Sequence, residues 1–152
     1  MSRVAILIPS HINYEGQIDL LDECIMSLLK QTILPKSIYI SISFENKNYK
    51  NLFVDKILKK YNEVMFLNLV FKFSNEKKYQ MEHLNNICST IDDNYDMLMF
   101  CDDDDTYDIT RVEEFIGYFN IGKDYLERII KPEIRSVTRE VIGNYLPEEL
   151  YS

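Results

Sequence analysis

Short runs of apolar residues alternate along this chain with longer segments in which apolar residues recur every three or four positions. The short runs are typical of strands and the longer segments of amphipathic helices. Strands are predicted at 4–8, 37–43, 64–71 and 97–101, and helices at 20–29, 52–61 and 76–90. Strict alternation of strand and helix predicts an α/β fold of Rossmann type, with three layers, a mainly parallel sheet and right-handed crossovers.

Three element boundaries follow from local chemistry. The first strand is expected to stop at Pro9 and Ser10, because proline cannot donate to a central ladder. The polar segment 44–50, rich in Asn and Lys, is expected to be a loop. The apolar run 97–101 has no polar alternation, which indicates a strand buried on both faces.

Four consecutive carboxylates, Asp102 to Asp105, follow this last run directly. Burying an unpaired charge costs many kcal/mol, so the strand should end at Cys101 and place the cluster at the sheet edge. Ligands of open α/β sheets bind just outside the carboxyl ends of the strands, and carboxylate oxygens suit Mg²⁺ or Mn²⁺. The alternative is a solvated turn in which Asp105 or Asp108 caps the next helix.

The net charge and the glycine content limit the classes of ligand that the chain is expected to bind. The net charge of −8 argues against nucleic-acid binding, although a divalent cation could still bridge this acidic chain to phosphate groups. Gly16 is the only glycine before Gly117, which excludes a Gly-rich dinucleotide fingerprint and a P-loop.

Cysteine usage and hydropathy indicate a cytoplasmic protein. Cys24, Cys88 and Cys101 show no metal-ligand spacing and are expected to be reduced and mostly buried. The apolar run at 4–8 is too short for a signal peptide, and no segment approaches the ~20 apolar residues of a transmembrane helix.

The N-terminal part, about residues 1–118, resembles a GT-A glycosyltransferase of the family 2-like type. The residues that carry the resemblance are the strand 4–8 with Pro9 and Ser10, Leu21, Cys24, Ser27-Leu28-Leu29, Gln31-Thr32, Pro35, the strand 37–43, Phe100 to Asp105, and Arg111-Val112. The resemblance implies the donor half of such an enzyme. Its donor would be a UDP- or GDP-sugar, and its acceptor a glycan or a protein.

By this resemblance Asp102 and Asp104 fill the DxD motif and bind Mn²⁺ or Mg²⁺, and through the metal the diphosphate of the nucleotide-sugar. A metal there would act as Lewis acid and template for the leaving diphosphate. Asp103 and Asp105 are implied to lie beside the bound donor.

The same resemblance implies that Pro9 and Ser10 line the nucleotide pocket and that Glu45 lies near the base. The segment Ser41 to Glu45 departs from the acidic Asp-Asp-Gly-Ser-like pattern usual after the second strand of the family. Transfer also needs a general base, usually a carboxylate well downstream of the metal motif, and only 47 residues follow Asp105. The catalytic residue is therefore not assigned.

Other polar residues near these elements have simpler interpretations. Lys77, Lys78 and Gln80 precede the third helix; a lysine there could meet phosphate, but a solvated face is favoured. His11 and His83 could be ligands, although a loop histidine and a helix-surface histidine are favoured.

Residues 119–152 form a second predicted segment. Its apolar stripe predicts a helix that Pro132 kinks or divides and that Gly143 closes. It resembles part of the SPFH (prohibitin/stomatin-like) domain, through its Asp-Tyr, Glu-Arg, Pro, Arg-Ser and Gly pattern, which implies possible self-association.

Two further functions remain open. Asp102, Asp104 and Thr106 also match the DxDxT motif of HAD-type phosphohydrolases, with Asp102 as nucleophile and Asp104 as acid/base. A non-catalytic assembly module, driven by the segment 119–152, is the third hypothesis.

Overall fold

The computed structural model describes residues 3–62, 68–91 and 94–125, which hold a four-stranded parallel sheet at their centre. The strands are β1 (Val4–Ile12), β2 (Ser37–Phe44), β3 (Asn68–Ser74) and β4 (Met97–Phe100), in the spatial order β3-β2-β1-β4. All three strand pairs are parallel. Their carboxyl ends therefore meet at one edge of the sheet.

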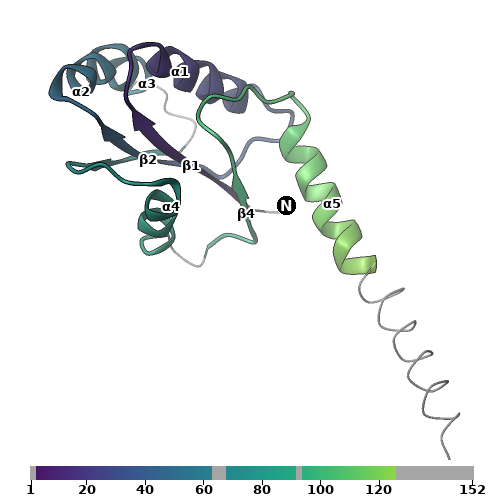
Figure 1. The fold of residues 1–152 in the computed structure, drawn as a ribbon. Coiled ribbons are helices and arrows are strands. Elements are labelled where there is room, and N and C mark those ends of the chain that lie inside the picture. The colour runs from purple at the N-terminus through teal and green to yellow at the C-terminus, as the bar shows by residue number, and fades with distance from the viewer. Residues whose placement is uncertain (1–2, 63–67, 92–93, 126–152) are drawn as a thin grey trace, which may run out of the picture. The chain divides into compact units, whose positions relative to one another are not determined.

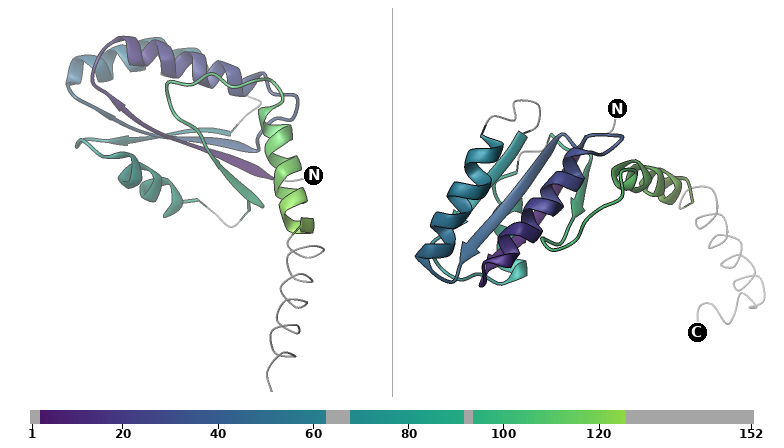
Figure 2. Two further views of the ribbon diagram at one scale, coloured as in Figure 1. Left: turned by 45° about the vertical axis from the view of Figure 1, so that its right-hand side comes forward. Right: turned by 90° about the horizontal axis from the view of Figure 1, so that it is seen from above.

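Helices cover both faces of this sheet (Figures 1 and 2). The helices are α1 (Gly16–Leu29), α2 (Lys47–Phe53), the π-helical η1 (Val54–Leu58), α3 (Lys59–Tyr61), α4 (Gln80–Cys88) and α5 (Arg111–Tyr125). Helices α1 to α3 lie on one face and α4 lies on the other. The predicted three-layer α/β architecture with a parallel sheet is confirmed.

The central strand explains the continuous apolar run at the start of the chain. Every residue from Val4 to Ile8 is buried. Ala5 and Leu7 pack against Ile87 of α4, and the alternation of a strand turns Ile6 and Ile8 to the other face. Because β1 has a helix layer on each side, both of its faces need apolar side chains.

The prediction that β1 stops at Pro9 is wrong, since β1 continues to Ile12 alongside β2. The Leu7 carbonyl accepts a hydrogen bond from the Cys101 N–H on the β4 side, and Pro9 faces the same side two residues later. The ladder between β1 and β4 ends at the pair of Leu7 and Phe100. A missing N–H at Pro9 therefore breaks no ladder hydrogen bond.

The prediction that β4 is buried on both faces is also wrong. Met97 and Met99 are buried, whereas Leu98 is 37% and Phe100 59% exposed. Leu98 and Phe100 pair with Ala5 and Leu7 and so point to the α4 face. Helix α4 packs on β1 and β2, so within the described residues up to Glu113 it leaves this face of β4 uncovered.

Three helices differ from the prediction at their ends, and α1 begins at Gly16 whereas the predicted helix begins at 20. The segment 44–50 is not all loop, because the Asn46 side chain accepts a hydrogen bond from the Tyr49 N–H (3.1 Å) and starts α2 directly. Helix α4 is shorter than 76–90, since the Glu82 carboxylate accepts from the Tyr79 N–H (2.7 Å) and fixes its first turn there.

The third strand also lies later than expected. Strand β3 runs from Asn68 to Ser74, against a prediction of 64–71; residues 63–67 lie outside the described residues.

The chain divides into two compact units, Met1–Glu113 and Glu114–Ser152, and the first contains the whole sheet. Residues 126–152, which include Pro132 and Gly143, lie outside the described residues. The boundary at 118/119, the divided tail helix and tail self-association therefore stay predictions. Among the described helices, none combines the length and the apolar character needed to cross a membrane.

Candidate functional site

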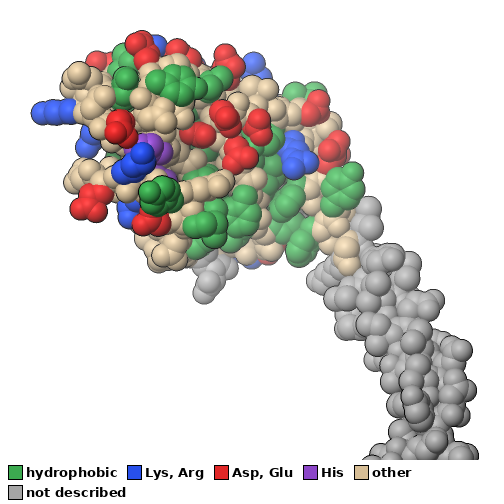
Figure 3. All heavy atoms as spheres, viewed as in Figure 1, with side chains coloured by type: hydrophobic (Ala, Val, Ile, Leu, Met, Phe, Trp, Pro, Cys, Tyr) green, Lys and Arg blue, Asp and Glu red, His purple; other side chains and the backbone are tan. Residues whose placement is uncertain are grey.

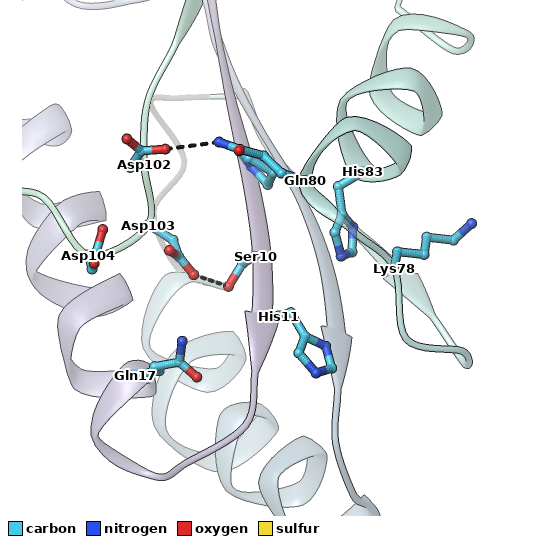
Figure 4. Close-up of a pocket in the computed structure, with 10 residues that line it drawn as sticks. Ser10, His11, Gln17, Lys78, Gln80, His83, Asp102, Asp103 and Asp104 are labelled. Atoms are coloured by element: carbon cyan, nitrogen blue, oxygen red, sulfur yellow. Dashed lines mark hydrogen bonds between the residues drawn. The ribbon is translucent and has the colours of Figure 1, made fainter.

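A cavity of about 240 Å³ opens at the carboxyl ends of β1 and β4, where an open α/β sheet places its ligands (Figure 4). Its lining residues are Pro9, Ser10, His11, Gln17, Lys78, Gln80, His83, Asp102, Asp103 and Asp104. In the close-up the three aspartates lie on one side of β1, and His11, His83 and Lys78 lie on the other. Figure 3 shows the same division at the surface, where carboxylates gather beside histidine and lysine side chains.

The backbone that carries the aspartates is held to the strands and to α1. The Cys101 N–H extends the β4 ladder by donating to the Leu7 carbonyl (3.0 Å). The Asp102 N–H donates to the Tyr107 hydroxyl (2.9 Å), and the buried thiol of Cys24 lies 3.4 Å from the Asp102 carbonyl. The loop thus leaves the sheet in a defined direction instead of as a free turn.

Residues of α1 and its end hold the other side of the same loop. The Ser27 hydroxyl accepts from the Tyr107 N–H (3.0 Å). The buried Gln31 amide donates to the Asp108 carbonyl (2.6 Å) and accepts from the Val112 N–H (2.9 Å). The Ser-Leu-Leu-x-Gln-Thr segment therefore has a physical role in positioning the acidic loop.

The four aspartate side chains differ in their surroundings. Asp103 is half-buried and accepts from the Ser10 hydroxyl (2.5 Å); burial raises the pKa of its carboxyl, and the Ser10 hydrogen bond opposes this rise. Asp102 accepts from the Gln80 amide (3.2 Å). Asp104 is exposed, and no hydrogen bond or ion pair reaches its carboxylate from the described residues. Asp105 is exposed and does not line the cavity.

This donor set fits a hard divalent cation that a ligand helps to bind. Asp102 and Asp104 offer carboxylate oxygens at one cavity wall, while no cluster of three or more potential ligands occurs among the described residues. Mg²⁺ commonly uses one or two carboxylates and completes its shell with water and substrate phosphates. The wall therefore suits a cation that arrives with a phosphate ligand.

The histidines lie elsewhere than predicted. His11 is part of β1, not of a loop, and its Nδ1 lies 2.8 Å from the Ser43 hydroxyl. His83 is 1% exposed, not on the helix surface, and bridges the hydroxyls of Ser41 (2.8 Å) and Ser43 (2.9 Å). Burial, and then the charges of His11 and Lys78, lower the pKa of His83 to about 4.

The serines of β2 were the signal that could have located His83. Ser41 and Ser43 alternate with buried isoleucines and are themselves fully buried, so both hydroxyls need polar partners. Helix α4 crosses that face of β2 and supplies the imidazole.

Glu45 and Lys77 lie beside the cavity, not in its wall. The Glu45 carboxylate contacts His11 Nε2 (3.1 Å) and Lys77 Nζ (3.7 Å), and it borders a second cavity of about 390 Å³. Lys77 is thus ion-paired, and Lys78 is the lysine that reaches the first cavity. Gln17, from the first turn of α1, also lines that cavity, and no pattern in the sequence marks it.

The structure is a three-layer α/β domain with a cavity at the carboxyl edge of a parallel sheet. No model of a protein family matches the chain, and no curated protein matches it.

Solved structures of TarS from S. aureus, whose fold is of the GT-A type, are similar to the chain. TarS residues 1–349 superpose with a TM-score of 0.56 at 17% identity, over 78% of this chain and 32% of that one. The longer TarS structure gives a TM-score of 0.57, over 78% of this chain and 19% of TarS. TarS 1–349 in complex with UDP gives 0.52, again at 17% identity. The chain thus spans about a third of TarS 1–349 and shares the fold of that part.

Proposed function

We propose that this chain is the donor half of a GT-A-type glycosyltransferase and binds a nucleotide-sugar at the carboxyl edge of its sheet. One observation carries the proposal: Asp102 and Asp104 share a single cavity wall, opposite His11 and Lys78, at the ends of neighbouring parallel strands. Complexes of the structurally similar TarS with UDP and with UDP-GlcNAc support this ligand class.

In this proposal Asp102 and Asp104 hold Mn²⁺ or Mg²⁺, and the cation meets the diphosphate of the donor. A bound divalent cation neutralises charge on a leaving diphosphate and orients it. Asp104 has no competing partner among the described residues, so its carboxylate needs no rearrangement to accept the cation. Lys78, on the opposite wall, adds positive charge for phosphate oxygens.

Pro9, Ser10 and Asp103 act on the donor by shape. The hydrogen bond from Ser10 to Asp103 ties β1 to the acidic loop, and both residues line the cavity. Glu45 contacts His11, which lines the cavity, and we place the base on this side. Asp105 lies outside the cavity and has a secondary role at most.

Transfer to an acceptor would require a general base within reach of the acceptor hydroxyl. In the described ranges the cavity carboxylates are those assigned to the metal and to the Ser10 contact, so none is assigned as base. The proposal therefore covers donor binding, and the acceptor, a glycan or a protein, stays open.

The test is a thermal-unfolding assay of the purified chain with UDP, with and without MnCl₂. We expect UDP to raise the Tm only when Mn²⁺ is present, and Asp104→Asn to abolish the increase. Glu23→Gln on the exposed side of α1 removes the same charge away from the cavity and should respond like the wild type.

Three outcomes would contradict the proposal. One is no Tm change with UDP, a second is a change that is independent of Mn²⁺, and the third is equal behaviour of Asp104→Asn and Glu23→Gln. Hydrolysis of small phosphoesters that depends on Asp102 would favour the phosphohydrolase alternative, although its motif follows the last described strand and not the first.

A further inference from the structure

Five side chains form a continuous hydrogen-bond chain from the core to the surface beside the cavity. Ser41 Oγ lies 2.8 Å from Nδ1 of His83, and Ser43 Oγ lies 2.9 Å from Nε2 of the same ring. Ser43 Oγ also lies 2.8 Å from Nδ1 of His11. The Nε2 atom of His11 then lies 3.1 Å from the Glu45 carboxylate. One hydroxyl, that of Ser43, thus joins the buried imidazole of His83 to the imidazole of His11.

Counting protons gives this chain a direction. An ionised carboxylate only accepts, so His11 must donate to Glu45 through Nε2–H. A neutral His11 then accepts at Nδ1, and the only proton available for that bond belongs to the Ser43 hydroxyl. Once Ser43 donates to His11, its oxygen can only accept from His83, which must carry its proton on Nε2.

The proton positions can also be assigned at the buried end of the chain of hydrogen bonds. His83 is neutral at ordinary pH because burial lowers its pKa to about 4. With the proton on Nε2, its Nδ1 accepts from the Ser41 hydroxyl, and Ser41 accepts in turn from the Asn86 amide (3.3 Å). No buried side-chain polar atom of the described residues lacks a partner. With both imidazoles neutral, a single arrangement of protons therefore satisfies the whole chain, with every donor directed toward Glu45.

We propose that His83 is a positioning residue of the donor site: its Nε2–H donates to Ser43, Ser43 donates to His11, and the Nε2–H of His11 holds the Glu45 carboxylate beside the cavity. The role in donor binding rests on the function proposed above, whereas the tautomers are a property of the protein alone. His83 is a positioning residue because it acts on Glu45 through two intervening side chains.

The test compares two serine variants on the same strand. Ser43→Ala removes the hydroxyl that joins the imidazoles. Ser37→Ala is the matched control, because Ser37 is equally buried on β2 and its hydroxyl accepts from Tyr95 (2.7 Å), not from a histidine. The chain has only two histidines, so ¹⁵N spectra of tag-free, histidine-labelled protein at about pH 8 report both tautomers without overlap.

We expect both histidines of the wild type to be Nε2–H tautomers. In Ser43→Ala the remaining partner of His83 is Ser41, so His83 should move to the Nδ1–H form. Affinity for UDP with MnCl₂, measured by calorimetry, should fall about five- to tenfold, which is the effect of one lost hydrogen bond. Ser37→Ala should keep both tautomers and the wild-type affinity.

The inference is overturned if His83 of the wild type is the Nδ1–H tautomer, or if Ser43→Ala leaves its tautomer unchanged. It is also overturned if Ser43→Ala binds UDP as Ser37→Ala does. Failure of the proposed function gives a different result, because the wild type then binds no UDP. The positioning role in donor binding then fails as well. The measured tautomers still test the direction of the hydrogen-bond chain.

A second variant applies if Ser43→Ala does not fold. His11→Ala truncates a side chain at the cavity wall and leaves the Ser43 hydroxyl free to donate to His83. His83 should then lose its exclusive Nε2–H form although the substitution lies two hydrogen bonds away. An unchanged His83 tautomer in this variant would overturn the inference.

Discussion

The two ends of the cavity are built on opposite principles. At the end of β4, backbone hydrogen bonds hold the loop while the Asp104 carboxylate stays without a partner among the described residues. At the end of β2, side chains form a continuous series of hydrogen bonds from Ser41 to Glu45. The first end has charge available for an external cation, and the second has an orientation that is already fixed.

We therefore expect the end of β4 to supply most of the binding affinity and the end of β2 to orient the ligand. An unpaired carboxylate gains most of its interaction energy when a cation arrives, because it breaks no internal contact to do so. A fully satisfied polar network adds little new energy on binding but limits the positions that its members can take. Variants at the two ends should therefore differ in size of effect and in what they change.

The largest effect is expected at the end of β4. Asp104→Asn should weaken Mn²⁺-dependent UDP binding by more than ~100-fold, since even residues that only support metal ligands contribute 10- to 100-fold. Calorimetry in MnCl₂ measures the ratio. A loss no greater than that of Ser43→Ala would remove the distinction between the two ends.

The second-largest effect is expected where Gln31 supports the acidic loop, and it should appear in the free energy of unfolding. Gln31→Ala leaves the Asp108 carbonyl and the Val112 N–H without their partner and should lower the free energy of unfolding by about 2–4 kcal/mol. Urea denaturation measures it. Thr32→Val is the control, because it removes only an exposed hydrogen bond to Glu113 (2.9 Å) and should cost less than about 0.5 kcal/mol. Equal costs in the two variants would show that Gln31 does not hold the loop.

Acid should act on the end of β2. The pKa of His83 is about 4 in the folded protein and near 6.5 when unfolded, so its neutral form stabilises the fold above pH 6.5. That contribution disappears as the pH falls from 6.5 to 4, and amounts to a loss of about 2 kcal/mol at about pH 5. Urea denaturation at about pH 7.5 and 5 measures it. In His83→Gln the pH-dependent loss should be smaller by this amount, and an undiminished loss would place its source at another group.

The smallest effect is expected at Asn46, the residue after Glu45. Asn46→Ala removes the cap of α2 and should cost about 1 kcal/mol in the free energy of unfolding. UDP affinity should stay within about twofold of the wild type, because Asn46 lies outside the first cavity. A larger change in affinity would extend the site to the second cavity.

The sequence predicted the fold well because its main signal is local. A continuous apolar run marks β1, and alternation marks β2, so the order of elements follows from short windows. The ends of strands depend on neighbours that are distant in sequence. Pro9 fits inside β1 only because β4 ends at Phe100, and no local pattern near Pro9 states where β4 ends.

The two ends of the cavity also differ in how well the sequence predicts them. Four adjacent aspartates after a strand are visible without a structure, and the structure places three of them in one cavity wall. The position of His83 depends on how α4 packs against β2, which periodicity does not specify. Buried serines at alternate positions of β2 were the local signal for a polar partner on that face.

The central claim is that Asp102 and Asp104 bind a metal ion together with a nucleotide. Its most direct test is a titration of the chain with Mn²⁺ in the presence of UDP, in which electron paramagnetic resonance measures the free ion. The wild type should remove one Mn²⁺ per chain from solution when UDP is present, and Asp102→Asn and Asp104→Asn should leave the free signal almost unchanged. If the wild type removes no Mn²⁺, or if both variants remove as much as the wild type, then these aspartates do not form the metal site of a nucleotide-sugar-binding domain.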